Sequence, residues 1–345
     1  MPSKVSYRDI AERANVSTAT VSRVARAQAT VDPAIRERVE KAAAELGVDI
    51  EQRRHEDRGV VAFLLSNRDI LHAFQARILL GAERYCSLHE RELLFMTFRY
   101  SPNAAPREIH LPRILNKSLV RAVILGGVNS GNMLEALRLR GMPFSVLGNN
   151  VIGEWNPSEH DVVYSDDIQG AYDLTARLIA DGHRRIYFIG NVDLPWYARC
   201  AMGYRKAMSE AGLEPAMSNI HSDGHQLGYL AMRSLLSDRE QVTAVFAGSD
   251  PIARGAYDAV RQCRLRIPED ISIAGFNDTE ASLMYPPLTT VREFPEELGH
   301  HLAEIVLRRV KCREGEPRQL TIPTQLIVRE STRPLSGGAI EIGAA

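Results

Sequence analysis

Apolar residues recur at helical spacing at the start of the chain. The segment SYRDIAERA (6–14) predicts one helix, and STATVSRVARA (17–27) predicts a second helix that is capped by Ser17. In the second helix Val21 and Val24 point inward, while small, hydroxyl-bearing and arginine side chains face outward. A tight turn separates the two short helices.

A third helix is predicted over residues 34–46 (AIRERVEKAAAEL). Asp32 is a typical N-cap, Pro33 suits the first helical position, and Gly47 is a typical C-terminal residue. Two short helices joined by a turn and closed by a third form the helix-turn-helix pattern, whose second helix enters the DNA major groove. The pattern alone also allows a three-helix bundle that docks another protein.

From residue 60 the pattern changes to short apolar runs that alternate with longer amphipathic segments. The runs end in Gly, Asn, Asp or Ser and include VVAFLL (60–65), ELLFMTF (92–98), AVILGG (122–127), PFSVLGN (143–149), RIYFIGN (185–191), AVFAGS (244–249) and SIAGFND (272–278). This alternation predicts an α/β region of parallel sheets flanked by helices. In such sheets ligands bind at the carboxyl ends of the strands, where these polar loops fall.

Composition and charge mainly exclude other classes of protein. The 345 residues are 45% hydrophobic, which suffices for two or three folding units, and their net charge is −1, so any attraction to DNA must be local. Over residues 1–31, five basic side chains stand against two acidic ones. The four cysteines are scattered without metal-ligand spacing, and neither a leader nor a membrane-spanning stretch is evident. We therefore expect a cytoplasmic protein without a membrane partner.

No catalytic constellation accompanies the α/β region. The GG pair at 126–127 belongs to no phosphate- or dinucleotide-binding motif, and no nucleophile elbow occurs. His221 and His225 have HxxxH spacing, but the Ser-Asp-Gly between them indicates a loop rather than a helical zinc site. The His-His pair at 300–301 lies on an amphipathic helix, where packing is the ordinary interpretation. We expect a binding protein rather than an enzyme, with no cofactor and no metal.

The stretch DIAERANVSTATVSRV (9–24) resembles the headpiece signature of the LacI/GalR family of transcription factors. The resemblance implies that Thr18 and Ala19 read bases, together with Arg23 of the TVSR motif. Hydroxyl side chains would hold phosphates, and Arg26 stands where the family usually has asparagine. The residues expected to contact double-stranded operator DNA are Tyr7, Ser17, Thr18, Ala19, Thr20, Ser22, Arg23 and Arg26.

Residues 60 to about 333 resemble the effector-binding core of the same family. DGHRRIYFIGN, TAVFAGSDPIARGAYDAV, IPEDISIAGFNDTE and LIVREST carry this resemblance, in the family's order. It implies a two-lobed core of the periplasmic-binding-protein type, in which three crossings join the lobes and a small ligand occupies the cleft. The expected units are the headpiece 1–47, a charged linker 48–59, the N-lobe (about 60–163 with 294–322), the C-lobe (about 164–293 with 323–333) and a tail, 334–345.

A ring of polar residues is expected around the cleft. Its members are His72, Phe74, Gly126, Gln169, Trp196, Arg199, Ser249, Asp250, Asn277 and Glu293. Such a ring suits a polyhydroxylated ligand, since each hydroxyl both donates and accepts. Trp196 is expected to stack on a sugar ring, and Arg199, one position away from the family's arginine, to reach inward. Neutral Asn277, in place of an aspartate, favours an anionic group such as a uronate or a sugar phosphate. Any one of these residues could instead be a loop residue bonded to local backbone.

The linker departs from the family. It lacks the proline, the asparagine and the leucine with which the family's hinge helix wedges the minor groove, and its acidic residues would repel phosphates. We expect a weaker or absent wedge and less kinking of the DNA.

Together these features predict a sugar-controlled transcriptional regulator, most simply a repressor. Two headpieces of a homodimer would read a pseudo-palindromic operator, and the tail lacks the heptad repeat of a tetramerising coiled coil. The core alone would equally suit a solute-binding protein for sugar transport. That alternative calls for a signal peptide and no headpiece, so it is disfavoured.

Overall fold

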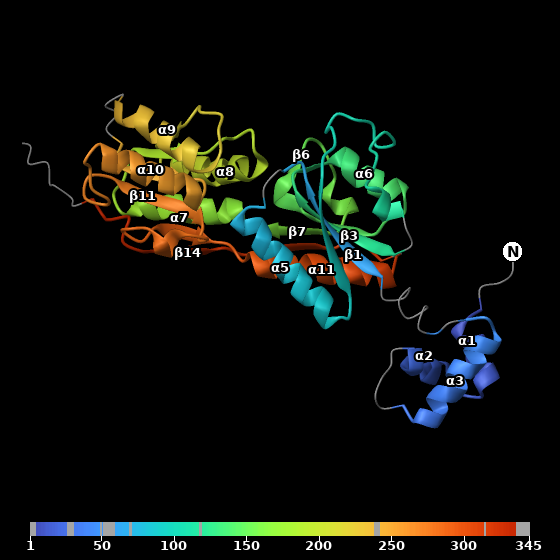
Figure 1. The fold of residues 1–345 in the computed structure, drawn as a ribbon. Coiled ribbons are helices and arrows are strands. Elements are labelled where there is room, and N and C mark those ends of the chain that lie inside the picture. The colour runs from blue at the N-terminus through green and yellow to red at the C-terminus, as the bar shows by residue number, and fades with distance from the viewer. Residues whose placement is uncertain are drawn as a thin grey trace, which may run out of the picture.

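The protein folds into a small helical headpiece followed by two α/β lobes, as seen in a computed structural model (Figure 1). The structure describes residues 5–25, 31–48, 50, 59–68, 71–116, 119–237, 242–313 and 315–335. The predicted fold class is confirmed. Among the described helices, none is both long and apolar enough to cross a bilayer.

The headpiece consists of three helices, α1 (Tyr7–Ala14), α2 (Thr18–Ala25) and α3 (Pro33–Glu45). Ser6 and Asp9 form a reciprocal capping box at the start of α1. Asn15 ends α1 in the left-handed region (φ 49°), which asparagine tolerates and which turns the chain sharply into α2. The Arg38 guanidinium of α3 donates to the carbonyl oxygens of Ala14 (2.7 Å) and Asn15 (3.2 Å), and so holds this turn.

The headpiece core extends beyond the predicted boundary at residue 47. Val48 packs against this core, and Ile50 is buried in it. Burial of these two apolar side chains explains the difference, because the sequence places them inside a charged stretch. Of the other linker residues, Gly59 is described, whereas residues 49 and 51–58 lie outside the described residues, and so does the prediction of a weak hinge wedge.

The N-lobe contains a six-stranded sheet in the order β13-β7-β5-β3-β1-β2, in which every pairing is parallel. Its strands are β1 (Val60–Ser66), β2 (Glu92–Phe98), β3 (Val120–Gly127), β5 (Phe144–Leu147), β7 (Val162–Ser165) and β13 (Gln319–Ile322). Helices α5 (Ala73–Leu88) and α11 (Pro295–Lys311) cover one face, and α6 (Gly131–Leu139) covers the other. A short two-stranded sheet pairs β4 (Asn129–Ser130) with β6 (Val151–Ile152).

Alternation along β1 shows how the N-lobe core is built. Val61 and Phe63 pack with α5 and α11, whereas Ala62 and Leu64 pack with α6. Side chains of a strand point alternately to its two faces, so a fully apolar run is buried on both sides. The run VVAFLL therefore forms a central strand.

The C-lobe repeats this architecture with the sheet order β14-β12-β11-β10-β8-β9. Its strands are β8 (Ile186–Ile189), β9 (Ala216–Met217), β10 (Ala244–Ala247), β11 (Ser272–Asn277), β12 (Thr289–Arg292) and β14 (Gln325–Ile327), and only the pairing of β14 with β12 is antiparallel. Helices α7 (Asp167–Ala180) and α8 (Pro195–Glu210) cover one face, while α9 (Gly224–Ser237) and α10 (Asp250–Gln262) cover the other.

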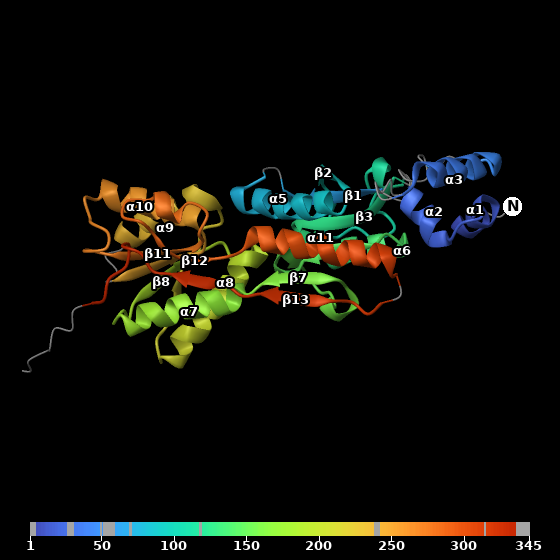
Figure 2. The same ribbon diagram turned by 90° about the horizontal axis from the view of Figure 1, so that it is seen from below.

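The chain passes between the lobes three times (Figure 2). The passages lie between β7 and α7, between β12 and α11, and between β13 and β14. At the first passage the N-lobe sheet continues to Ser165, two residues past the predicted boundary, because the run VVYS is still paired in the sheet. Residues around these passages are therefore shared by both lobes.

Candidate functional site

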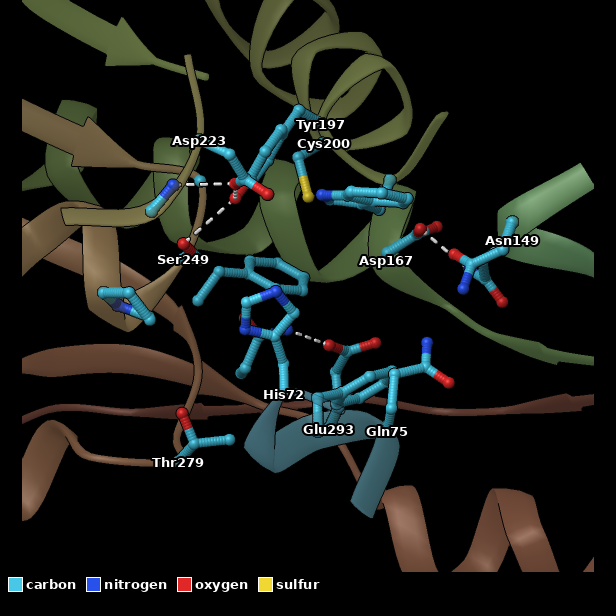
Figure 3. Close-up of a pocket in the computed structure, with 18 of the residues that line it drawn as sticks. His72, Gln75, Asn149, Asp167, Tyr197, Cys200, Asp223, Ser249, Thr279 and Glu293 are labelled. Atoms are coloured by element: carbon cyan, nitrogen blue, oxygen red, sulfur yellow. Dashed lines mark hydrogen bonds between the residues drawn. The ribbon is translucent and has the colours of Figure 1, made fainter. Parts of the chain in front are cut away.

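A cavity of about 580 Å³ lies between the lobes. Its walls come from the carboxyl ends of strands in both sheets and from the helices that follow them, where ligands bind in open α/β sheets. Figure 3 shows the carboxyl groups of Asp167, Asp223 and Glu293 approaching this space from three different segments. Three carboxyl groups therefore lie on the walls of a cavity that residues of both lobes line.

The C-lobe wall contains a hydrogen-bonded group around Asp223. The Tyr197 hydroxyl and the Gly224 N–H both donate to Asp223 Oδ1 at 2.7 Å, and Ser249 Oγ lies 3.3 Å from the Tyr197 oxygen. Burial raises the pKa of the Tyr197 phenol well above its ordinary value, so the hydroxyl stays a donor. This group presents fixed acceptors and donors to the cavity.

Arg68 joins the two lobes across the cavity. It follows β1 in the N-lobe, yet its guanidinium donates to Asp223 Oδ2 at 3.4 Å and lies 4.4 Å from the centre of the Trp196 ring. Both partners belong to the C-lobe, and the Arg68 side chain is only 16% exposed. The contact combines an ion pair with a cation–π interaction, worth about 1 kcal/mol in total because the Asp223 side chain is 39% exposed.

Asp167 lies at the first passage between the lobes, at the start of α7. Arg199 Nε from α8 is 2.8 and 3.0 Å from its two carboxylate oxygens, and the Asn149 amide of the N-lobe donates to Oδ2 at 2.8 Å. Asn149 also bonds to the backbone N–H and carbonyl of Ser165. Burial raises the pKa of Asp167, although Arg199 opposes this shift. Arg199 therefore neutralises Asp167 rather than facing the cavity.

Glu293 lies at the second passage, between β12 and α11. Its carboxylate accepts a hydrogen bond from the Asn277 amide, and the side chain is almost fully buried. Burial raises its pKa to about 7, and the neighbouring Asp167 acts in the same direction. Unlike Asp167 and Asp223, Glu293 has no arginine among its partners in the described part of the chain.

Six of the ten residues predicted for the cleft line the cavity, namely His72, Phe74, Trp196, Ser249, Asn277 and Glu293. The other four stand outside its lining. Gly126 is packed behind it, since a Cβ there would meet the Phe63 ring at 2.7 Å. Gln169 is exposed and bonds to Asp173 along α7.

Asp250 supports the cavity wall from behind. It is fully buried at the start of α10, where Oδ2 accepts the N–H groups of Thr279 (2.6 Å) and Glu280 (3.0 Å) and Oδ1 accepts the Thr290 hydroxyl. These bonds fix the loop after β11, which does line the cavity. Arg199 and Asp250 are thus positioning residues for their neighbours.

Several lining residues were not predicted, among them Arg68, Gln75, Asn149, Asp167 and Tyr197. Two of them carried a usable signal, since Arg68 and Asn149 each lie two residues after the end of a strand, β1 and β5 respectively. Polar residues at the carboxyl ends of parallel strands are the expected ligands of such a site. Asp167 stands two residues before the predicted Gln169, where the first turn of α7 faces the cleft.

The outer face of α2 forms a second candidate site. Thr18, Ala19 and Arg23 are exposed, and Ser22 is half-buried. Ser17 caps the helix, because its Oγ accepts the Thr20 N–H at 3.0 Å and lies 2.8 Å from the Thr20 hydroxyl. A small and polar face of this kind allows close approach to a DNA groove.

Tyr7 and Arg26 complete the set of residues predicted to contact DNA. Tyr7 on α1 is half-buried against the headpiece core. Arg26 lies outside the described residues.

The HxxxH histidines do not converge, because His221 contacts Asp193 and His225 contacts Asp258.

Two family models match the chain. Residues 6–48 match the model of bacterial regulatory proteins, lacI family, and residues 175–332 match that of a periplasmic binding protein-like domain. The first match coincides with the headpiece, and the second with most of the C-lobe and the two later passages between the lobes.

Curated relatives align over nearly the whole chain. The ribose operon repressor of Haemophilus influenzae is 32% identical over 342 residues, which covers 94% of this chain and 98% of the repressor. The HTH-type transcriptional regulator CelR of Thermobifida fusca is 32% identical over 335 residues, covering 93% and 96%. A solved structure of a transcriptional regulator CelR–cellobiose complex has a TM-score of 0.68 at 30% identity, and covers 95% of this chain and 100% of that one.

Proposed function

Because this chain belongs to the lacI family of bacterial regulatory proteins, we propose that it represses transcription from an operator under the control of a small ligand. One observation carries this proposal: a helix-turn-helix with an exposed reading face precedes a cavity lined by both lobes. The headpiece also disfavours the solute-binding alternative, since a transport protein has no use for it. The site of action would be operator DNA in the bacterial cytoplasm.

For DNA recognition we propose that α2 enters the major groove. Thr18 and Ala19 would lie against base edges, and Arg23 would reach a guanine edge or a phosphate. Ser17, Thr20 and Ser22 would contact phosphates, with Tyr7 beside the groove. Two headpieces of a homodimer would occupy the two half-sites, as the two-fold symmetry of such operators requires.

For the effector we propose a neutral carbohydrate. The cavity offers fixed hydroxyl, amide and carboxylate groups with apolar surface from Phe74 and Phe276, the combination that a sugar ring with polar edges requires. The anionic ligand that Asn277 favoured now fits poorly. Asp167 and Asp223 already engage Arg199 and Arg68, so among the described lining residues a uronate would meet no arginine that lacks a carboxylate partner.

We propose that the ligand acts by biasing how the lobes sit together. The cavity reaches residues at two passages between the lobes, Asp167 and Glu293, and the Arg68 contact that spans the cleft. A ligand that bridges these groups binds one lobe arrangement better than another, and this difference is the whole free energy available for control. The atypical linker would transmit the change with little kinking of the DNA.

The test uses the full-length protein and two variants with opposite expected defects. An operator is first selected from random duplexes, and an effector is found by a thermal-shift screen of neutral sugars and matching uronates. A ligand at about 100 times its Kd should stabilise the protein by about 2.7 kcal/mol. Arg23→Ala should lose about tenfold or more in operator affinity by gel shift and keep effector binding.

The second variant, Trp196→Ala, should show the reverse. Its effector affinity in calorimetry should fall roughly fivefold, because the cavity loses an aromatic wall and the ring against which Arg68 packs, while the variant still binds the operator without ligand. Arg8→Ala serves as the headpiece control, since Arg8 is exposed and pairs with Glu12 on α1. Equal operator affinity of Arg23→Ala and the parent protein would refute the assignment of the reading helix.

A further inference from the structure

Two neighbouring histidines on α11 are flanked by carboxylates one turn away. Successive residues of a helix are rotated by about 100°, so His300 and His301 point in two directions, and Glu304 lies between these directions one turn further on. Helical side chains lean toward the N-terminus, which brings the Glu304 carboxylate back toward the histidine pair. One ligand atom of each of the three residues lies within 4.8 Å of those of the other two.

One hydrogen bond already joins two of these three side chains. His301 Nδ1 lies 2.8 Å from Glu304 Oε2, and His301 Nε2 is 3.9 Å from Glu297 Oε1 in the preceding turn. The histidine rings contact each other edge to face, with centroids 5.2 Å apart. Within the described residues this is the one group of three histidine, cysteine or acidic side chains whose donors converge in this way.

The helix that carries these donors is firmly held. Leu298, Leu302 and Val306 on its opposite side are fully buried in the N-lobe core. Gly299 packs directly on the backbone of α5, where an added Cβ would stand 1.9 Å from the Ile78 carbonyl oxygen. Donors on rigid elements keep their geometry better than donors on loops, so little ordering is needed when an ion binds.

An aromatic neighbour from α5 restrains one ring. Tyr85 contacts the His300 ring edge to face, at 4.5 Å between centroids, and its other neighbour is the stacked ring of His89 at 4.1 Å. These contacts fix the plane of the His300 imidazole while the donor group stays partly open to solvent. A metal ion could therefore enter without unpacking the core.

We propose that His300, His301 and Glu304 form a binding site for a divalent transition-metal ion of the zinc class. Two imidazoles and one carboxylate suit Zn²⁺, Co²⁺ and Ni²⁺, whereas Ca²⁺ and Mg²⁺ prefer oxygen ligands alone. Tetrahedral zinc with bonds of about 2.0–2.1 Å needs ligand atoms about 3.4 Å apart, so the present separations of up to 4.8 Å must shorten when the ion binds. Three protein ligands leave one position for water.

This proposal is independent of the repressor function and of the cleft. The test is calorimetric titration of the full-length, chelator-treated protein with Zn²⁺, repeated with Co²⁺ so that the visible absorption of tetrahedral cobalt reports on the ligands. The parent protein should bind one ion in the micromolar range. His300→Gln, His301→Gln and Glu304→Gln should each weaken binding about tenfold or more and lose the cobalt band.

The matched control is His110→Gln, which removes an exposed histidine outside the donor group. The exposed thiols Cys263 and Cys312 are kept in every variant, so any binding by them cancels in the comparison. Unchanged circular dichroism and an unchanged metal-free melting temperature would show that the variants fold.

Two results would overturn the site. One is absence of zinc binding by the parent protein. The other is zinc binding by Glu304→Gln as tight as that of the parent protein, because Glu304 would then not be a ligand of the ion.

Discussion

Glu293 makes the stability of the protein depend on pH, and a single substitution at this residue should remove that dependence. Its carboxyl is buried at the second passage between the lobes, where Asn277 donates to it and the charges of Asp167 and Asp250 lie nearby. Burial raises its pKa from 4.5 to about 7. The folded state therefore holds a proton on Glu293 over a pH range in which the unfolded state has released it.

The direction in which stability changes with pH follows from this difference in bound protons. Stability contributed by the protonated form is fully present at pH values below the unfolded pKa and is lost as the pH rises through about 7. Between about pH 5.5 and about pH 8 the loss is about 2 kcal/mol, from a shift of 1.36 kcal/mol per pKa unit. Glu293→Gln cannot ionise and still offers an oxygen to the Asn277 amide, so the variant should escape this loss.

Urea or thermal unfolding at the two pH values measures the effect. Relative to the parent protein, Glu293→Gln should gain about 2 kcal/mol on going from the lower to the higher pH, or about 4 °C or more in Tm. Asp250, whose pKa is raised to about 6 by burial, changes stability in the same direction but is present in both proteins and cancels. Glu214→Gln, at an exposed position, is the matched control.

A constant difference in stability between the parent protein and Glu293→Gln across this pH range would contradict the prediction. A constant difference would mean that Glu293 has the same proton occupancy in the folded and unfolded states. Its burial between the lobes would then carry no electrostatic cost.

Three further substitutions test other contacts. Gly299→Ala should lower the Tm by several degrees, because the added methyl group would overlap the Ile78 carbonyl and push α5 and α11 apart. An unchanged Tm would contradict this packing. Arg38→Met should destabilise the headpiece by about 1–2 kcal/mol, because the side chain loses its hydrogen bonds to the α1–α2 turn. Hydrogen exchange of the headpiece measures this loss, and the control Arg8→Met should change the stability by less than about 0.5 kcal/mol. Arg68→Met should loosen the ligand-free cleft and increase the radius of gyration in X-ray scattering; equal scattering curves would show that this contact does not hold the lobes together.

The fold was predictable because its determinants are local. Short apolar runs that end in Gly, Asn, Asp or Ser gave strands at nearly the observed positions, and β1 is the clearest case. The short elements β7, β12 and β14 were not predicted as strands, because their three or four residues gain most of their stability from neighbouring strands rather than from their own pattern.

The cleft was predictable only in part, because its contacts join residues that are far apart in sequence. Trp196 was expected to present a free face to a sugar, yet Arg68 lies over its ring. Arg199 was expected to reach inward, and Asp167 captures it. No pattern along the chain records which arginine meets which carboxylate, since that depends on how the two lobes are brought together.

The position of β1 has a consequence for how a signal can travel. This strand begins at Val60, directly after the linker, and ends beside Arg68 at the cleft. Its seven residues span about 23 Å, and both of its edges are paired with neighbouring strands. A strand that is hydrogen-bonded on both sides cannot slide without breaking the sheet. We therefore expect β1 to move as part of the sheet, with a fixed distance between the cleft and the start of the linker. On this basis we expect a ligand signal from the cleft to reach the headpiece through a rotation of the whole N-lobe, which would displace the residue to which the headpiece is attached.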